Sequence, residues 1–345
     1  MESFTQRRKG YAKTQRGNQG KYDEPVLQRS ASGANLMTKA LVTGGAGFIG
    51  SNLARLLAEE GYDVVVLDNL ATGYRENLEG LKHVRLVEGD VRDVKVIDRV
   101  TDGAEVIFHL AASVGNTRSI ENPLDDSDVN VLGTLRVLEA ARRARVRKVV
   151  CSSSAAIFGE LKHLPIREDH PCEPDTPYGV SKLAEEKHCL AYAKLYELEA
   201  VCLRYFNVYG LNQRYDAYGN VIPIFAQRML HGETLTIYDD GEQTRDFVNV
   251  RDVARANILA AQTRGLSGAF NVASGEAITV NRLVQLMHEA SGIEPSVKYA
   301  PPRKGDVRNS RADISAASAA FRYQPAVELL EGLTEYMAWA RSNLN

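Results

Sequence analysis

A tyrosine and a lysine, Tyr178 and Lys182, stand four positions apart directly after Pro177. On a helix, that spacing places both side chains on one face, one turn apart. A tyrosine phenol ionises at about pH 10 in water, and an ammonium group held close to it favours the phenolate and lowers that pKa. The pair therefore predicts a base that removes a proton from a hydroxyl group near neutral pH.

A serine at the end of an apolar run completes this arrangement. The run from Val149 to Ser154 is typical of a buried strand, and Ser154 is its last residue. A hydroxyl group at that strand end would bridge a substrate oxygen and the phenol of Tyr178. We therefore predict that Ser154, Tyr178 and Lys182 form a catalytic set, in which Lys182 also hydrogen-bonds a ribose.

A glycine-rich turn, Thr43 to Gly50, follows the first apolar run and opens a helical pattern. Gly44, Gly47 and Gly50 permit a tight turn, close approach of a pyrophosphate to backbone N–H groups, and close packing of helix on strand. Asp68 ends the next strand, where a carboxylate accepts hydrogen bonds from adenosine ribose hydroxyls and repels a 2′-phosphate. These features predict NAD as the cofactor.

The segments that would position these residues alternate between strand and helix. Apolar runs typical of buried parallel strands are Ala40 to Thr43, Val64 to Leu67, Val84 to Val87, Val106 to Leu110, Val149 to Ser152 and Ala200 to Tyr205. Helical patterns between them are Phe48 to Glu60, Val129 to Arg143 and Tyr178 to Leu195. The alternation predicts an α/β fold with a doubly wound parallel (Rossmann-type) sheet.

The regular alternation of strands and helices does not continue to the end of the chain. Residues 37–206 are expected to form the NAD-binding Rossmann domain, with Ser154, Tyr178 and Lys182 in it. Residues 207–345 carry shorter elements between Gly-, Asn-, Asp- and Pro-rich segments, which predicts a smaller C-terminal substrate-binding cap. Segments at about 245–265 are expected to return to the Rossmann domain. Residues 1–36 are polar and basic without apolar periodicity, so we expect a disordered leader or extension there.

The overall composition limits the classes of partner. The formal net charge of −2 does not favour nucleic acid or an anionic membrane. No apolar run approaches the roughly 20 residues that cross a bilayer. The cysteines, Cys151, Cys172, Cys189 and Cys202, form no C-x-x-C pair, and the histidines have no metal-ligand spacing. We therefore expect a cytoplasmic protein with no metal, no nucleic acid and no membrane as partner.

Taken together, these motifs resemble the extended short-chain dehydrogenase/reductase family, and within it the UDP-glucose 4-epimerase-like (NAD-dependent epimerase/dehydratase) group. The resemblance extends from about Lys39 to the C-terminus. It rests on Thr43 to Gly50, Leu110 to Ala112, Ser152 to Gly159, Tyr178 to Lys182, Arg204 to Gly210, Thr244 to Val250 and Gly305 to Arg308.

The resemblance implies a set of binding residues. Besides the glycine turn and Tyr178, those lining the NAD site would be Phe48, Ile49, Asp68, Asn69, Asp90, Val91, Leu110, Ala111, Ala112, Asn130, Lys182 and Phe206. Those holding the UDP-sugar would be Ser154, Asn207, Arg214, Asn220, Val221, Thr236, Tyr238, Arg245, Arg303 and Asp306. Arg245 and Arg303 suit a diphosphate, because a guanidinium binds phosphate oxygens through two parallel hydrogen bonds.

The resemblance also implies an activity and an assembly. Tyr178 would accept the 4-OH proton of a UDP-hexose while the C4 hydride passes to NAD. The 4-keto sugar would then rotate and take the hydride back on its other face. Relatives pair through a four-helix bundle built from the helices at Val129 and Tyr178, which predicts a homodimer.

Neighbouring activities of the family need other residues. Nucleotide-sugar 4,6-dehydratases carry an Asp-Glu pair after the strand-end hydroxyl residue, and decarboxylating relatives carry a Glu there. Here Ala155 and Ala156 follow Ser154, which disfavours elimination chemistry. Asp68 disfavours an NADPH-dependent reductase, and the intact catalytic set disfavours a non-catalytic NAD-binding regulator.

The sugar itself stays open between three UDP-hexoses. Ser310 matches a position where strict UDP-glucose epimerases carry a bulky tyrosine, and a small residue there would admit an N-acetyl group. Arg214 matches an arginine that UDP-glucuronate 4-epimerases direct at the C6 carboxylate, although those relatives commonly have Thr where this chain has Asn207. Val114 stands where some epimerases have a lysine near the nicotinamide. UDP-glucose, UDP-glucuronate and UDP-N-acetylglucosamine are therefore all candidates.

Overall fold

A computed structural model describes residues 37–215, 220–302 and 307–344 of the chain. The contacts along the chain gather Met37–Asn345 into one compact unit. The predicted leader, residues 1–36, lies outside the described residues. Among the helices that the structure describes, none is long and apolar enough to span a membrane.

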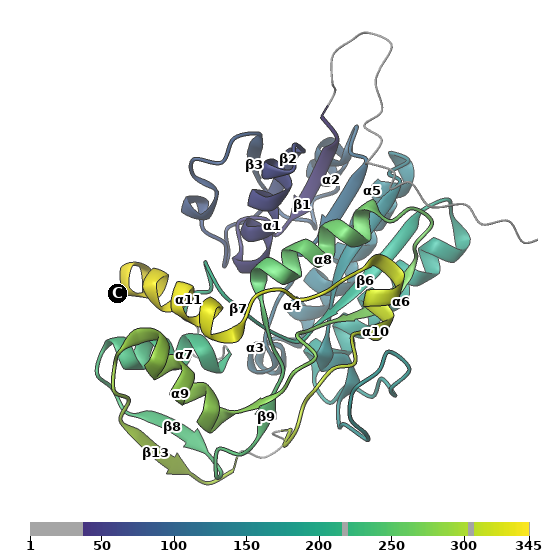
Figure 1. Ribbon diagram of the computed structural model, residues 1–345. Coiled ribbons are helices and arrows are strands. Elements are labelled where there is room, and N and C mark those ends of the chain that lie inside the picture. Colours follow the sequence, from purple (N-terminus) through teal and green to yellow (C-terminus); the bar gives the residue numbers. More distant parts are fainter. Residues whose placement is uncertain (1–36, 216–219, 303–306, 345) are drawn as a thin grey trace, which may run out of the picture. The chain divides into compact units, whose positions relative to one another are not determined.

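A seven-stranded sheet forms the centre of the fold (Figure 1). All neighbouring strands in it run parallel. In sheet order they are β11 (Gly268–Val272), β6 (Glu199–Tyr205), β5 (Lys148–Ser154), β4 (Val106–His109), β1 (Lys39–Thr43), β2 (Asp63–Asp68) and β3 (Val84–Glu88). This order reverses direction between β1 and β4, which is the point where Rossmann sheets bind dinucleotides. The predicted doubly wound parallel sheet is confirmed.

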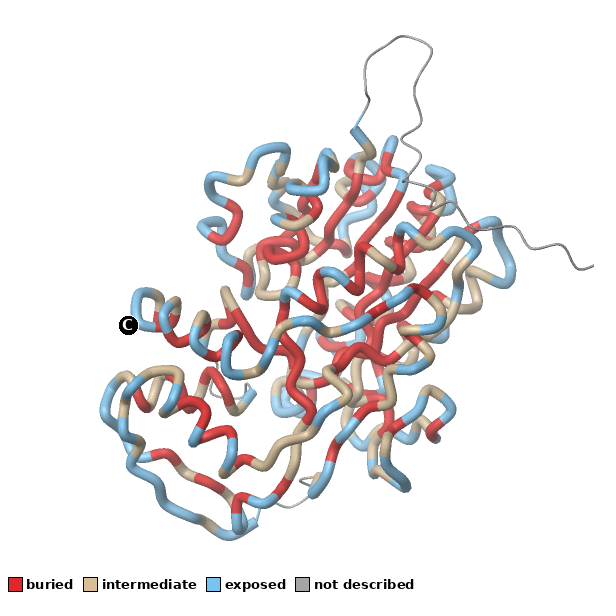
Figure 2. Tube along the Cα trace, viewed as in Figure 1, coloured by how far each residue is buried: buried red, intermediate tan, exposed pale blue. Residues whose placement is uncertain are grey.

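Helices cover both faces of the sheet, and the strand sequences show why. Alternate residues of β1 belong to different cores: Val42 packs beneath one helix layer and Leu41 beneath the other. The first layer contains α1 (Phe48–Glu59), α8 (Val250–Gln262) and α10 (Ser315–Phe321), and the second contains α2 (Val94–Thr101), α5 (Thr134–Arg143) and α6 (Pro177–Leu195). Burial on both faces explains why inner strands such as β1 and β2 are continuous apolar runs, and Figure 2 shows the inner strands as buried.

The C-terminal half adds a second, separate core. It contains α7 (Val221–Leu230), α9 (Val280–Ser291) and α11 (Leu329–Asn343), packed with the parallel pair β8 (Leu235–Tyr238) and β13 (Val297–Ala300). Two further small pairs are β7 (Asn207–Tyr209) with β10 (Phe247–Asn249), and β9 (Thr244–Arg245) with β12 (Ile278–Thr279). We predicted that segments at about 245–265 return to the Rossmann domain. The structure shows that a longer part of the chain returns, because β11 also joins the main sheet beside β6. The division of labour between residues 37–206 and 207–345 stays a prediction.

The helix expected at Val129–Arg143 does not begin as an α-helix. After α3 (Asn116–Glu121) and α4 (Pro123–Ser127), the π-helix η2 spans Asp128–Gly133, and α5 begins at Thr134. The Thr134 hydroxyl donates to the Asn130 carbonyl oxygen at 2.5 Å. A side-chain donor that takes a helix carbonyl in this way competes with the regular backbone ladder.

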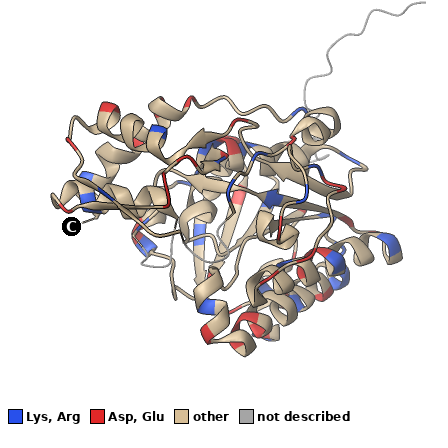
Figure 3. Ribbon diagram, turned by 90° about the horizontal axis from the view of Figure 1, so that it is seen from below, with Lys and Arg blue, Asp and Glu red and all other residues tan. Residues whose placement is uncertain are grey.

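Surface helices carry both signs of charge, as Figure 3 shows. On α5, Arg142 pairs with Glu139 at 2.9 Å, and Arg143 pairs with Asp98 of α2 at 2.6 Å. These pairs are exposed, so each stabilises the fold by less than about 1 kcal/mol. The stability of the fold therefore depends mainly on the apolar cores.

The packing of α1 on the sheet gives a first prediction. Leu57 is completely buried in that core, whereas Arg55, two residues earlier on the same helix, is exposed. We expect Leu57→Ala to lower the free energy of unfolding by about 2–5 kcal/mol, because it removes buried methyl groups and leaves a cavity. Arg55→Ala should change it by less than about 0.5 kcal/mol. Urea unfolding followed by circular dichroism measures both, and equal midpoints for the two variants would contradict the assigned packing.

Candidate active site

Asp68, Ser154 and the glycine turn, which were predicted to be functional, lie at one edge of the main sheet. Asp68 ends β2, His109 ends β4 and Ser154 ends β5, and the glycine turn follows β1. The carboxyl ends of parallel strands lie at the same edge, so these segments meet beside the switch point between β1 and β4.

The glycine turn forms a cradle that side chains would fill. Gly44 has φ +69°, and a Cβ added there would lie 2.6 Å from the backbone nitrogen of Ala111. A Cβ on Gly50 would lie 2.1 Å from the carbonyl oxygen of Gly44. Gly47 is the N-cap of α1, and no side chain caps that helix end. The backbone N–H groups of this helix start are therefore directed at a place that suits a diphosphate.

Asp68 is tied to the glycine turn. Its Oδ2 accepts a hydrogen bond from the Ala46 backbone N–H at 2.9 Å, and its Oδ1 accepts one from the Leu70 N–H at 2.8 Å. A carboxylate has about four acceptor positions, so two remain for hydroxyl groups. The arrangement fits the ribose contact that was predicted for Asp68.

Asp90 and Asn69 lie together, as predicted for residues of one binding site. The Asn69 side-chain amide donates to Asp90 Oδ2 at 2.9 Å, and Arg92 donates to both carboxylate oxygens. The Arg92 hydrogen bonds are the main cause that lowers the pKa of Asp90 to about 2. Arg92 also contacts Asp125 and Asp128 at 3.2 and 3.1 Å. Arg92 was not predicted from the sequence.

The loop after β4 is held over the switch point. The Leu110 N–H donates to the Thr43 carbonyl at 3.1 Å, and the Ala111 N–H donates to the Thr43 hydroxyl at 3.3 Å. The side chain of Asn130, completely buried in η2, exchanges two hydrogen bonds with the Ser113 backbone, at 2.7 and 3.0 Å. Asn130 therefore orders the loop that contains Leu110, Ala111 and Ala112.

The remaining residues predicted for the NAD site occupy the surrounding walls. Phe48 and Ile49 open α1 and are half-buried against the first core, and Val91 is buried in the second. Phe206, also buried, contacts the ring of Phe158 with centroids 6.4 Å apart. These positions fit the predicted lining.

The three predicted catalytic residues come together. Thr176 caps α6 through a hydrogen bond from the Gly179 N–H at 3.2 Å, which places Tyr178 in the first turn. Ser154 ends β5, and α6 packs against that strand. Burial raises the pKa of Tyr178, although Lys182 and Ser154 act in the opposite direction. The expected net lowering is therefore not found, because the desolvation of the phenol outweighs both partners.

Lys182 has an acidic partner that sequence reasoning missed. Its Nζ lies 2.5 Å from Oε2 of Glu185 and 3.5 Å from the hydroxyl of Ser152. Burial opposes the charge of Lys182, but the negative groups beside it, Glu185 first, raise the pKa of its ammonium. The other oxygen of Glu185 accepts a hydrogen bond from the Cys151 thiol at 2.7 Å. The signal that could have revealed Glu185 is its position three residues after Lys182, on the same helix face.

Several residues predicted for the sugar nucleotide lie on the small strands of the C-terminal half. Asn207 begins β7, Thr236 and Tyr238 lie on β8, Arg245 ends β9, and Asn220 and Val221 begin α7. Arg303 and Asp306 lie outside the described residues. No described hydrogen bond joins the residues of this set to Tyr178.

A buried aspartate that was not predicted connects these strands. Asp246 is completely buried and accepts hydrogen bonds from the backbone N–H groups of Ser274, Gly275 and Ala312 at 2.8 to 3.1 Å. Its carbonyl oxygen accepts one from the Asn207 amide at 3.0 Å. Asp246 therefore fixes Asn207 relative to the loops that follow β11.

The described contacts of Arg214 are with residues outside the catalytic set. Its guanidinium lies 4.0 Å from the ring centroid of Tyr74, and its Nη1 donates to the Asn343 carbonyl at 3.4 Å. Next to it, the Asn212 amide donates to the Ser51 hydroxyl on α1 at 3.0 Å. None of the described contacts of Arg214 involves Ser154, Tyr178 or Lys182, so its role toward a substrate stays a prediction.

His109 ends β4, and Val114 lies on the loop between β4 and α3. His109 is completely buried between the hydroxyls of Thr43 and Thr134, at 2.7 and 2.9 Å. Burial lowers its pKa to about 3, so it is a neutral packed side chain. Val114 is about half exposed and supplies no charge. No group of acidic, histidine or cysteine side chains within 37–215, 220–302 and 307–344 could hold a metal ion.

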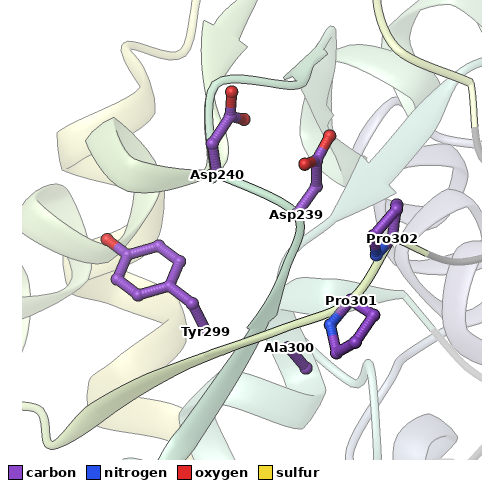
Figure 4. A pocket seen from close by; sticks show the side chains of 6 residues that line it. All are labelled: Asp239, Asp240, Tyr299, Ala300, Pro301 and Pro302. Carbon is purple, nitrogen blue, oxygen red and sulfur yellow. The ribbon is translucent and has the colours of Figure 1, made fainter.

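An open cavity of about 540 Å³ lies at the carboxyl ends of β8 and β13, on the chain segment that leads to residues 303–306. It is lined by Asp239, Asp240, Tyr299, Ala300, Pro301 and Pro302 (Figure 4). Arg308 holds both aspartates, with its Nη1 at 2.7 Å from each. The cavity lies at the end of β8, the strand that carries Thr236 and Tyr238, and its lining includes neither these two residues nor Ser154, Tyr178 or Lys182.

The comparisons with known proteins agree with this geometry. Residues 40–273 match the model of the "NAD dependent epimerase/dehydratase family". A protein of Methanocaldococcus jannaschii named "Putative UDP-glucose 4-epimerase" is 39% identical over 305 residues, which are 88% of this chain and 98% of that protein.

Two solved structures are similar in fold but differ in chemistry. The UDP-N-acetylglucosamine 4-epimerase of Methanobrevibacter ruminantium M1, in complex with UDP-N-acetylmuramic acid, superposes with a TM-score of 0.86 at 34% identity over 89% of this chain and 99% of that one. The dTDP-glucose 4,6-dehydratase of Streptomyces venezuelae, with NAD bound, gives 0.82 at 32% identity over 89% and 98%. The glycine cradle and Asp68 fit NAD as the cofactor, and the chain belongs to the NAD-dependent epimerase/dehydratase family.

Proposed function

We propose that this chain is a UDP-hexose 4-epimerase that inverts C4 through a transient 4-keto sugar. The observation that carries the proposal is the placement of Tyr178 and Lys182 one turn apart at the start of α6, with Ser154 at the end of β5, the strand against which α6 packs. These groups stand at the carboxyl edge of the sheet, next to the cradle that fits a dinucleotide.

The catalytic residues would handle the proton. Tyr178, as phenolate, removes the proton from the 4-OH of the sugar, and Ser154 bridges the phenol and that oxygen. NAD, when bound, supplies the acceptor that takes the C4 hydride and returns it to the opposite face of the 4-keto sugar. Tyr178 then returns the proton to O4, so the sugar keeps its composition and only its C4 configuration changes.

The residues after Ser154 favour epimerisation over elimination. Loss of water across C5 and C6 needs an additional acid and base beside the sugar, but Ala155 and Ala156 carry no titratable group. The similarity in fold to a 4,6-dehydratase does not decide the matter, because the same fold accommodates both reactions. The absence of a carboxylate directly after Ser154 is therefore the feature that favours epimerisation.

A second candidate substrate is UDP-N-acetylglucosamine. The Ser310 backbone N–H donates to the Thr244 carbonyl at 3.2 Å, which places this small residue beside Arg245. A serine at this position leaves more room than a tyrosine would. That space favours a sugar with an N-acetyl substituent as an alternative to UDP-glucose.

We also propose a cytoplasmic homodimer that pairs through the helices at Val129 and Tyr178, which are η2 with α5, and α6. Leu132 on η2 and Val180 on α6 are exposed by 46 and 54%, and Ile120 on α3 and Leu124 on α4 by 61 and 86%. Exposed large apolar side chains of this kind are typical of a protein–protein contact. Cys151, Cys189 and Cys202 are buried free thiols, which suits a reducing compartment.

The assigned base gives the next prediction. Tyr178→Phe should lower epimerisation of UDP-glucose by at least about a thousandfold, because the variant has no group to accept the 4-OH proton. The purified variant should still contain NAD, since the cradle is intact. Product analysis of the UDP-sugars and extraction of the nucleotide measure these two properties. A Tyr178→Phe enzyme with normal turnover would disprove the role of the tyrosine.

The glycine cradle gives a prediction about cofactor content. Gly50→Ala should reduce the NAD retained on purification by roughly tenfold or more, because its Cβ would collide with the backbone of Gly44. Gly61→Ala is the matched control, since a Cβ on Gly61 meets nothing within 4 Å. It has φ +83° and should cost about 1 kcal/mol of stability without loss of NAD. If both variants retain the same amount of NAD, the cradle is assigned wrongly.

The identity of the sugar is tested with three substrates and one variant. UDP-glucose, UDP-N-acetylglucosamine and UDP-glucuronate are each incubated with the enzyme without added cofactor, and the products are separated. We expect C4 epimers with no accumulation of NADH, because the hydride returns in every turnover. Since Arg214 contacts Tyr74 and Asn343, Arg214→Ala should affect the three substrates equally. A selective loss with UDP-glucuronate would assign Arg214 to the carboxylate.

A further inference from the structure

Glu185 is a buried acid in direct contact with the proposed catalytic lysine. Its Oε2 lies 2.5 Å from Lys182 Nζ, and both side chains are at most 2% exposed. Lys182 has one other described partner, the Ser152 hydroxyl at 3.5 Å. The ammonium that would act on Tyr178 is therefore held by a buried carboxylate.

The position of Glu185 is fixed by the sheet as well as by the helix. The thiol of Cys151, on β5, donates to Glu185 Oε1 at 2.7 Å. One carboxylate oxygen is thus anchored to β5 and the other to Lys182. An apolar pair of similar volume at such a site is often as stable or more stable, so packing alone does not account for the buried charges.

We propose that Glu185 is a positioning residue for the catalytic pair: it holds the Lys182 ammonium and balances part of its charge, which limits how strongly Lys182 favours the phenolate of Tyr178. The proposal rests on the 4-epimerase function. In that reaction Tyr178 both removes a proton and returns it, so a phenol that is too acidic would return it poorly.

The charges around Tyr178 agree in sign with this role. Lys182 lowers the pKa of Tyr178, whereas Glu185 and Asp126 raise it. Other titratable groups face Lys182 or Glu185 from the packed elements: Tyr178, Glu186 and Cys189 on α6, Cys151 on β5, Asp126 on α4, His109 on β4, and Cys202 and Tyr205 on β6. None of these groups has a described hydrogen bond to Lys182, whereas Glu185 has one.

The next residue on the helix is a matched control. Glu186 is also buried, and its Oε1 pairs with Arg204 at 2.8 Å, while its Oε2 accepts from the Ser153 hydroxyl at 2.8 Å. Both glutamates are therefore buried, paired with a cation and tied to β5. They differ in that the partner of Glu186 is not the catalytic lysine.

The test compares the dependence of kcat on pH for the enzyme, Glu185→Gln and Glu186→Gln. In Glu185→Gln, no carboxylate balances the charge of the Lys182 ammonium, so the phenolate of Tyr178 forms at lower pH. The acidic limb of the kcat profile therefore moves to lower pH. On that limb, kcat relative to its own plateau should be roughly tenfold higher than in the unchanged enzyme, which corresponds to about one pH unit. Glu186→Gln should leave the limb in place. Limbs that coincide in all three proteins, or that move equally in both variants, would overturn the proposal.

A second measurement separates this proposal from the epimerase function. The absorbance of ionised tyrosine is titrated in the NAD-bound enzyme and in Glu185→Gln, and each curve is corrected with its Tyr178→Phe counterpart. Ionisation of Tyr178 at lower pH in Glu185→Gln supports the proposal, and unchanged ionisation overturns it, even if no UDP-sugar is epimerised. Should Glu185→Gln not fold, Glu185→Met, which fills a similar volume without charge, is titrated in the same way.

Discussion

Parallel pairing of β1, β2, β4 and β5 is the constraint on which the site depends. It brings the carboxyl ends of these strands to one edge, so the glycine turn, Asp68 and Ser154 meet although they are far apart in the sequence. The reversal of strand order between β1 and β4 opens a crevice there. The absence of side chains at Gly44 and Gly50 then allows α1 to begin directly at that crevice.

Buried ion pairs concentrate on the layer formed by β5, β6 and α6. Lys182 pairs with Glu185, Arg204 with Glu186, and Lys148 with Glu199, and each pair includes at least one side chain with no more than 2% exposure. Removing one partner from such a pair leaves an uncompensated buried charge, which is strongly destabilising. The pair of Arg204 on β6 with Glu186 on α6 joins the helix to the sheet, so it helps to fix the position of Tyr178 relative to the strands.

Local patterns predicted the parts of the site that depend on short spacings. The glycine turn and the Tyr178–Lys182 pair could be found because a turn or one helical turn contains all the necessary information. The parallel sheet could be predicted because strands buried on both faces are continuous apolar runs. The π-helix at Asp128–Gly133 could not, since it depends on how the side chains of Asn130 and Thr134 bond within the folded protein.

Residues whose partners are distant in sequence were missed. Asp246 bonds to Ser274 and Ala312, which are 28 and 66 positions away, and no pattern in its own segment indicates this. Glu185 was missed for a different reason: an acidic residue on a helix normally faces water, but α6 is covered by the sheet on one side and by α3, α4 and η2 on the other. Its burial follows from the layering of the fold and not from the helix itself.

The hydrogen bonds of Asp246 connect the main sheet with the strands that lead to the second core. It lies between β9 and β10, its carboxylate binds the loops after β11, and its carbonyl oxygen binds Asn207 directly after β6. Both β6 and β11 belong to the main sheet, whereas β9 leads back to β8 and the second core. A displacement of β7 and β9 would therefore break hydrogen bonds of Asp246, a completely buried residue, which costs about 1–3 kcal/mol for each group left unpaired. This link gives the region of Asn207 and Arg245 a defined position relative to the sheet edge at which Ser154 ends β5.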